Sequence, residues 1–158
     1  MDVGERLASL EARLRAVEDE LAIHKLIVRY GLAVDSGDAE RTAAVFAADG
    51  VYDADVRLMR GRAAVADMVR GARHQAMVGH CAHQIGPAIV RLHGDTATAL
   101  GYSRVYLQEA DGIGVYRVSF NRWTLARQAD GWAITHRFTR LLGHEEALAI
   151  LHDGLDAV

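Results

Sequence analysis

The sequence has one cysteine, no long apolar run and no excess of basic residues in its 158 positions. Because Cys81 is alone, no disulfide can form within the chain, and a reducing cytoplasm is the expected location. No apolar run approaches the ~20 residues that span a bilayer, and the first 20 residues are too charged for a secretory signal. The net charge of -3 is dispersed and leaves no basic stripe for nucleic acid. We therefore expect no membrane and no nucleic acid among the partners.

Apolar residues make up 51% of the chain, which is enough for one domain with a core of ordinary size. No repeat, low-complexity tract or linker marks a boundary, so we expect a single domain over residues 1–158. Residues 1–20 are expected to form an N-terminal helical arm. Apolar residues recur along this arm and into the next turn at spacings of three and four: Leu7, Leu10, Leu14, Val17 and Leu21. The stripe predicts packing against the domain itself or against another copy in a homodimer or homotrimer.

Helical patterns occupy the first half of the chain and strand patterns the second half. Periodicity predicts one or two helices over residues 4–34, another from Asp38 through Phe46, and another from Ala63 to about Met77. Between the helix that ends at Phe46 and the helix that begins at Ala63, the segment AADGVYDAD predicts a turn that leads into a strand.

Turn sequences divide residues 82–143 into four runs with period-two alternation. The turns lie at 93–95, 110–112 and 129–131, and each favours a hairpin. A strongly bent antiparallel sheet packed against three N-terminal helices would form a cone with one open end. The expected fold class is therefore α+β, a cone-shaped α+β barrel with a short C-terminal helix.

Two distant segments, YGLAVDSGD at 30–38 and HCAHQIG at 80–86, supply a carboxylate and an imidazole. Asp35 lies where an apolar helix gives way to a turn, and His83 lies where a loop gives way to a strand. A carboxylate that contacts an imidazole orients it and raises its basicity, as a general base needs in order to take a proton from carbon. The pair predicts chemistry that needs no cofactor.

The order of YGLAVDSGD, DGVYD, HQIGP and hairpins ending in DGWAITH resembles the SnoaL-like branch of the nuclear transport factor 2 superfamily over nearly the whole chain. Asp35 and His83 match the positions of the catalytic Asp-His pair in scytalone dehydratase and hexachlorocyclohexane dehydrochlorinase. With Tyr30 they are similar to the catalytic trio of bile acid 7α-dehydratase, to which an arginine on the last strand contributes. The resemblance implies that Arg140 is the counterpart of that arginine. Because this fold serves many activities, the Asp-His match favours catalysis more than the fold does.

Alternation along the last strand predicts which side chains enter a cavity inside the cone. One face combines large apolar groups with ionisable ones: Trp132, Ile134, His136, Phe138, Arg140 and Leu142. Such a mixture suits an apolar, oxygen-bearing substrate better than a dry core. On the preceding strand, alternation leaves open whether Phe120 or its neighbours Ser119 and Asn121 face the cavity. The candidate substrate contacts are Tyr52, Phe120, Trp132, His136 and Phe138.

A metal site is the main alternative use of the histidines, through His80 and His83 with Asp35 or Asp53. A spacing of three on a strand places the two histidines on opposite faces, and no Cys-x-x-Cys or His-Glu-x-x-His motif accompanies them. Cys81 is expected to be a small spacer, because only histidine lies near enough in sequence to activate its thiol. No glycine-rich phosphate loop follows a strand. We therefore expect neither a metal nor another cofactor.

These patterns together predict a cofactor-independent lyase or isomerase that removes a proton from carbon, as in a dehydratase-like elimination. The expected substrate is an apolar oxygenated ring compound such as a sterol, a polyketide or a lignin-derived aromatic. The same proton abstraction would serve an aldol-type polyketide cyclase. A non-catalytic ligand-binding or assembly module, or a dioxygenase small subunit, stays open as well. In that case Asp35 would only end a helix, and His83 and Tyr30 would be core residues.

Overall fold

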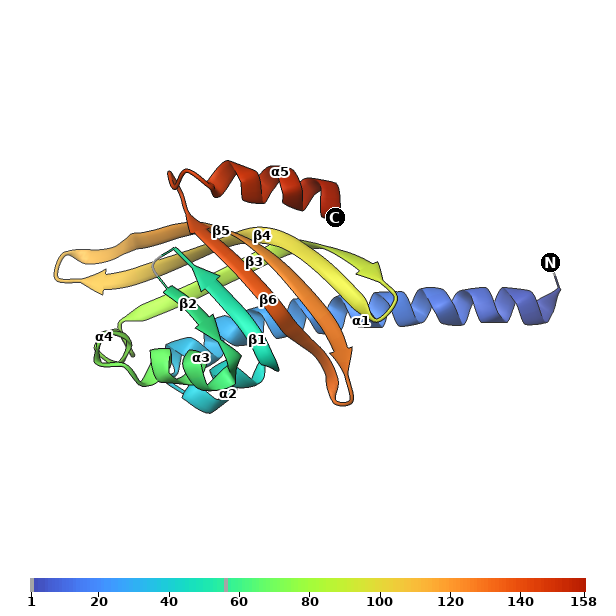
Figure 1. Cartoon of the computed structure of the whole chain (residues 1–158), viewed down its shortest axis with the longest axis horizontal. Helices are drawn as coiled ribbons and strands as arrows, with labels where there is room; N and C mark the ends of the chain where they lie inside the picture. The colour runs from blue at the N-terminus through green and yellow to red at the C-terminus, as the bar shows by residue number, and fades with distance from the viewer. Residues whose placement is uncertain (1, 56) are drawn as a thin grey trace.

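The computed structural model describes residues 2–55 and 57–158. These residues form five helices: α1 (Val3–Asp35), α2 (Ala39–Ala44), α3 (Gly61–Arg70), α4 (Ala72–Gln75) and α5 (Ala147–Ala157). They also form six strands: β1 (Phe46–Ala54), β2 (Arg57–Arg60), β3 (Cys81–His93), β4 (Thr96–Glu109), β5 (Gly112–Gln128) and β6 (Gly131–Leu141). The strands make one bent, open sheet in the order β2-β1-β6-β5-β4-β3 (Figure 1). The α+β class expected from the sequence is confirmed.

The helices lie on both sides of this sheet (Figure 1). Helix α1 packs on β3 and β6, and α3 packs on β1 and α2, so these helices cover the concave inner face. Helix α5 contacts β4, β5 and β6 from the other side. The inner face is therefore the one that can enclose a cavity. None of the helices in the described residues is long and apolar enough to cross a membrane.

The last four strands form the hairpins that the turn sequences predict. Strands β3, β4, β5 and β6 pair in antiparallel fashion, each with the next along the chain. Strand β1 instead pairs in parallel with β6, so the sheet is mixed rather than wholly antiparallel. The chain reaches this parallel position because the long β3 to β6 meander separates the two strands in sequence.

The second helix is shorter than its pattern predicts. Helix α2 ends at Ala44, and Phe46 already begins β1, where it is fully buried and pairs with Ile134 of β6. The burial of this aromatic ring in the sheet outweighs the local helical pattern. The third predicted helix is divided into α3 and α4, because Gly71 adopts an extended conformation between them.

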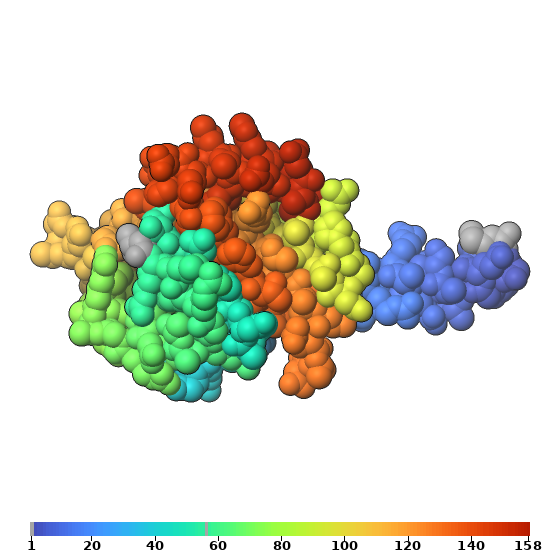
Figure 2. Space-filling view, viewed as in Figure 1, coloured from blue at the N-terminus to red at the C-terminus, as the bar shows by residue number. Residues whose placement is uncertain are grey.

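Helix α1 has two parts with different surroundings. Its first turns begin with a capping box, in which the Asp2 carboxylate accepts from the Glu5 backbone and the Glu5 carboxylate accepts from the Asp2 backbone. This N-terminal part projects away from the sheet and stands clear of the rest of the molecule (Figures 1 and 2). Farther along, the carboxylate of Asp19 accepts hydrogen bonds from Arg127 and Trp132 and fixes the helix to the end of the sheet.

The C-terminal part of α1 is buried and approaches β3 closely. At Gly31 the space for a Cβ is already filled, because that atom would lie 2.6 Å from the carbonyl oxygen of His83 and 3.1 Å from Cγ1 of Ile85. Asp35 follows one helical turn later, so it emerges beside the same strand. The missing side chain at Gly31 therefore sets how near the end of α1 comes to His83.

We predict that Gly31→Ala will destabilise the protein although alanine is the better helix former. The new methyl group must push α1 away from β3, and overpacking of this kind costs roughly 1–3 kcal/mol, against a gain of about 1 kcal/mol in helix propensity. Urea unfolding monitored by circular dichroism measures the difference. Gly114→Ala is the matched control, because a Cβ there meets nothing within 4 Å. Equal stability of the two variants would contradict the packing argument.

Candidate active site

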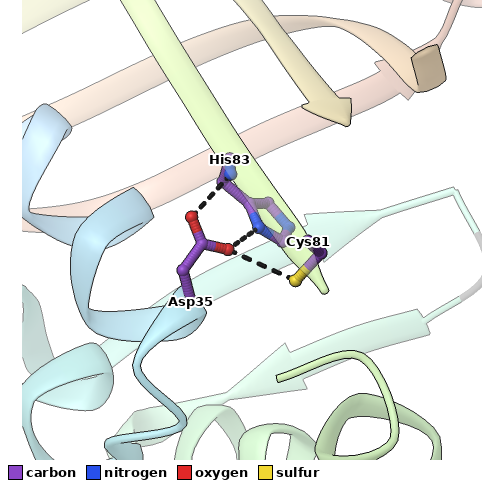
Figure 3. A group of neighbouring side chains, drawn as sticks. All are labelled: Asp35, Cys81 and His83. Atoms are coloured by element: carbon purple, nitrogen blue, oxygen red, sulfur yellow. Dashed lines mark hydrogen bonds and ion pairs between the residues drawn. The ribbon is translucent and has the colours of Figure 1, made fainter. Parts of the chain in front are cut away.

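Asp35 and His83 meet at the point where α1 ends beside β3. The Asp35 carboxylate makes two contacts with His83: Oδ1 accepts from the ring Nδ1 at 2.5 Å, and Oδ2 accepts from the backbone N–H at 2.6 Å. Cys81 lies two residues earlier on the same face of β3, and its thiol donates to the same Oδ1 at 3.5 Å (Figure 3). The two contacts to one residue fix both the position of the carboxylate and the plane of the imidazole.

The hydrogen bonds determine the protonation pattern of this group. Burial alone would raise the pKa of Asp35, but the ring and backbone donors of His83 and the thiol of Cys81 outweigh it and bring the pKa below its usual value. An ionised Asp35 only accepts, so Nδ1 of His83 carries a proton and Nε2 is the nitrogen left for a substrate. Burial, followed by the charge of Asp35, raises the pKa of the Cys81 thiol to about 11. The thiol is therefore a hydrogen-bond donor and not a nucleophile.

A cavity of about 390 Å3 adjoins the His83 ring on the inner face of the sheet. Its apolar wall is made by side chains from α1, β2, α3, β4 and the segment after α4: Val34, Met59, Met68, Met77 and Val105. Tyr30 and Tyr52 line it too, with their rings edge to face at 6.0 Å. The cavity is thus largely apolar, and strands β4, β5 and β6 add the polar side chains of Ser103, Arg117, Arg137 and Thr139, which form its floor.

Arg137 of β6 lines this cavity and is 2% exposed. Its Nε and Nη2 donate to Oδ1 of Asn121 at 3.0 and 2.8 Å, and its guanidinium lies 4.3 Å from the ring centre of Tyr30 and 4.7 Å from that of Tyr52. Nη1 is buried without a hydrogen-bond partner among the described residues. Within that part of the chain no carboxylate pairs with Arg137, so the cavity floor holds a buried, uncompensated cation.

Other charged groups around the cavity are also positive. Arg57, Arg73 and Arg117 line it, and of these Arg117 is paired with Asp55. Among the described lining residues there is no aspartate or glutamate. The electrostatic environment of the cavity therefore favours an oxygen with negative charge.

His74 is a cavity residue that the sequence patterns did not identify. It belongs to α4 and is buried, and its Nε2 donates to the backbone oxygen of Val34 at 2.8 Å. The bond to a carbonyl fixes the proton on Nε2 and leaves Nδ1 as the free ring nitrogen of the neutral form. The ring centre lies 6.4 Å from that of His83. His74 is thus a second imidazole at the cavity.

The expected face of β6 holds only for the first half of that strand. Ile134 pairs with Leu125 and His136 pairs with Thr124, which leaves Thr135 without an opposing residue in the register of β5 and forms a β-bulge. Beyond the bulge the inward-facing residues are Arg137 and Thr139, which line the cavity. The sequence prediction that His136, Phe138 and Arg140 enter the cavity assumed strict alternation, and the extra residue reverses it.

Arg140, the predicted catalytic arginine, lies on the opposite face of β6 from the cavity. Its Nη1 donates to Asp53 at 2.9 Å, its Nε pairs with Glu146, and its guanidinium covers the ring of Phe138 at 3.9 Å. Two carboxylates thus balance its charge and tie β6 to β1 and to the segment before α5. His136 is also outside the cavity, and its ring contacts Phe138 edge to face.

The remaining candidate contacts divide between the cavity and other parts of the fold. Tyr30 and Tyr52 line the cavity. Phe120 lies on the outer face, where its ring contacts that of Tyr102 at 5.4 Å with the planes tilted by 60°, so the inner face of β5 is the one with Ser119 and Asn121. Trp132 belongs to the core, 4.7 Å below the guanidinium of Arg127. The sequence had left the choice between the faces of β5 open.

The donor atoms of Asp35, Cys81 and His83 lie within 4.8 Å of one another, close enough for one metal ion to contact all three. His80, the histidine considered with His83 in the sequence, is not part of this group, and its ring faces Gln108 at 3.4 Å. Asp53 is likewise held by Arg140.

Comparison with known proteins places the whole architecture in one family. The sequence profile of the SnoaL-like domain matches residues 15–138. A solved NTF2-like protein with a cystatin-like fold from Novosphingobium aromaticivorans is 43% identical, has a TM-score of 0.88, and covers 92% of this chain and 96% of its own. A candidate aromatic ring hydroxylase from the same organism is 26% identical, with a TM-score of 0.69 and coverage of 80% and 90%.

A protein from Catenulispora acidiphila, solved in complex with S-DNPA, shares the fold at 24% identity, with a TM-score of 0.68 and coverage of 82% and 96%. No curated protein matches the chain. The profile spans most of the chain, and it includes Asp35 and His83 together with Arg137. The chain belongs to the SnoaL-like family, with the NTF2-like fold.

Proposed function

We propose that this protein is a cofactor-independent lyase or isomerase that removes a proton from a carbon atom of its substrate. The observation that carries the proposal is the contact between Asp35 and His83 at the wall of an apolar cavity. A neutral imidazole whose Nδ1–H is held by a carboxylate presents a basic Nε2. The orienting carboxylate also stabilises the imidazolium that forms when Nε2 takes the proton.

The electrons of the broken C–H bond need an acceptor, and the cavity floor supplies one. If the carbon lies next to a carbonyl, the C–H electron pair forms a carbon–carbon double bond and the π electrons of the carbonyl move onto its oxygen, which gives an enolate. The buried guanidinium of Arg137, with Nη1 free, is the cation available to bind that oxygen. Burial, with Tyr52 adding to it, raises the pKa of Tyr30 far above its usual range, so Tyr30 keeps its proton and its hydroxyl is a potential hydrogen-bond donor in the cavity.

The enolate can then react in two ways. Expulsion of a hydroxyl from the β-carbon, with the proton returned from His83, releases water and is an elimination. Return of the proton to a different carbon shifts the double bond and is an isomerisation. Elimination and isomerisation, like an aldol cyclisation, begin with the same abstraction of a proton from carbon. The site therefore supports reactions that start in this way, and the structure of the substrate decides which product forms.

The cavity also indicates what kind of substrate enters. Its volume of about 390 Å3 and its methionine-rich wall suit a small ring compound with mostly carbon surface. The buried cation at the floor requires an oxygen that is anionic or becomes so during reaction. A polyketide, a sterol fragment or a lignin-derived aromatic with a carbonyl group meets both requirements.

A binding or assembly module, including a dioxygenase small subunit, is the competing function. The burial of Arg137 without a carboxylate disfavours a purely structural assembly role, because such a core has no reason to retain an uncompensated cation. A non-catalytic module that binds an anionic ligand would also retain this cation, and the exchange assay described below separates that function from catalysis. We also propose a reducing cytoplasm as the location, in keeping with the free thiol of Cys81.

We predict that His83→Ala will abolish proton abstraction and that Asp35→Asn will reduce it by about 10⁴-fold. An amide at position 35 donates toward Nδ1, which drives the ring proton to Nε2 and blocks the base. Exchange of the α-hydrogens of cyclic ketones and β-hydroxy ketones in D2O, followed by NMR, measures this step without knowledge of the natural substrate.

The control for this experiment is His80→Ala, which removes a nearby exposed imidazole outside the dyad. It should exchange at the wild-type rate. Circular dichroism confirms that each variant is folded. Wild-type exchange by a folded double variant, Asp35→Asn with His83→Ala, would remove the proposed mechanism.

Arg137 and Arg140 give a second, paired prediction. Arg137→Met removes a cation that has no carboxylate to leave behind, so the free energy of unfolding should stay near the wild-type value or rise. Exchange activity should fall by about 10²–10³-fold, as on loss of an oxyanion donor. Arg140→Met should do the reverse, because it leaves Asp53 and Glu146 unpaired but lies outside the cavity. Thermal unfolding and the exchange assay together measure both effects, and equal loss of activity in the two variants would contradict the assignment.

We further propose that the single domain assembles into a homodimer or homotrimer through residues 1–20 of α1. The apolar stripe of this arm and of the turn that follows it is half or more exposed at every position: Leu7, Leu10, Leu14, Val17 and Leu21. An exposed stripe of this length on a projecting helix is suited to a second copy of itself.

We predict that Leu14→Glu will weaken assembly, since it places a charge in the middle of the stripe. Ala12→Glu introduces the same charge on the opposite side of the helix and should leave assembly unchanged. Light scattering at micromolar concentration distinguishes the two. A monomeric wild-type protein under these conditions would rule out the proposed assembly.

A further inference from the structure

The group formed by Asp35, Cys81 and His83 contains three different metal-binding atoms around one point (Figure 3). Oδ1 of the carboxylate lies between Nδ1 of the ring and Sγ of the thiol and interacts with both. The side chains come from two rigid elements, the end of α1 and adjacent inward positions of β3. The proposed proton chemistry uses the carboxylate and the imidazole, and the thiol enters it only as a hydrogen-bond donor to Asp35.

The distances in this group agree with those around a tetrahedral zinc ion. With Zn–S near ~2.3 Å and Zn–O near ~2.0 Å, the sulfur and oxygen ligands stand about 3.5 Å apart. Sγ of Cys81 and Oδ1 of Asp35 are separated by 3.5 Å. The Nδ1 to Oδ1 distance of 2.5 Å must open to about 3.3 Å, which a small rotation of the two side chains achieves. A set of one sulfur, one nitrogen and one oxygen favours Zn2+ over Mg2+ or Ca2+, which prefer oxygen ligands only.

We propose that Asp35, Cys81 and His83 form a Zn2+ site that competes with the base function of His83. On binding, the thiol loses its proton to solvent, and thiolate and carboxylate together balance the two charges of the ion. Nδ1 must give up its proton to bind the metal, so in the neutral ring that proton resides on Nε2. The second carboxylate oxygen stays on the backbone N–H of His83 and holds the ligand in place.

The consequence for regulation follows from the position of the ring proton and rests on the proposed function. An imidazole that binds Zn2+ through Nδ1 has Nε2–H toward the cavity and cannot accept a proton from carbon. Zinc would therefore switch the site off reversibly, and removal of the ion would restore it. The binding itself does not depend on what the protein catalyses.

Binding of Zn2+ and Co2+ to the full chain tests the proposal without any substrate. After treatment with a chelator, the wild-type protein should bind one equivalent of Zn2+ in calorimetry, with micromolar or tighter affinity. Co2+ should give the near-ultraviolet sulfur-to-cobalt charge-transfer band that reports a thiolate ligand. Cys81→Ala should lose this band and bind Zn2+ at least tenfold more weakly, while His80→Ala should match the wild type in both measurements.

Two results would overturn the zinc site: absence of the charge-transfer band in the wild type, or unchanged Zn2+ affinity in a folded Cys81→Ala variant. Neither depends on the exchange assay. If Zn2+ binds as expected while the Asp35 and His83 variants keep full exchange activity, only the proposed function fails. If the dyad variants lose activity and Zn2+ does not bind, only the zinc site fails.

Discussion

The close approach of α1 to β3 is the constraint on which the site depends. At Gly31 the helix has no side chain, and the strand carbonyl of His83 occupies the space that a Cβ would need. One turn later Asp35 reaches both the backbone and the ring of His83. The same contact brings Tyr30 and Val34 of α1 to the cavity wall. Helix position, dyad geometry and cavity shape are therefore coupled through one backbone contact.

The position of Asp35 at the end of α1 has an energetic cost that its partners on β3 offset. A carboxylate at a helix C-terminus faces the negative end of the helix dipole, an unfavourable arrangement of about 0.3–1 kcal/mol, and the last turn of α1 contains no basic residue. The donors of His83 and the thiol of Cys81 compensate for it and keep the carboxylate ionised. A residue that is unfavourable for the helix in which it lies, and that is stabilised by partners distant in sequence, is typical of a functional position.

The dyad and most of the fold could be predicted because they depend on local signals. Turn sequences located the hairpins, and Asp35 and His83 stand in segments whose residues resemble a known family. Arg137 could not be found in this way, because the bulge at Thr135 reverses the alternation and depends on how β5 and β6 pair. His74 also carries no sequence signal, since only the packing of α4 against the end of α1 brings it to the cavity.

The two arginines of β6 illustrate why charge balance, and not residue type, identifies a site. Arg140 has two carboxylate partners, so its charge is used to join strands and helix. Arg137 is buried as deeply, yet aromatic rings and one amide oxygen are its only neighbours of opposite polarity among the described residues. Cation–π contacts offset part of the cost of removing the Arg137 guanidinium from water. The rest of that cost is not compensated, because Nη1 has no hydrogen-bond partner among the described residues. A ligand oxygen would supply the missing partner, so the cavity is most favourable electrostatically when it is filled.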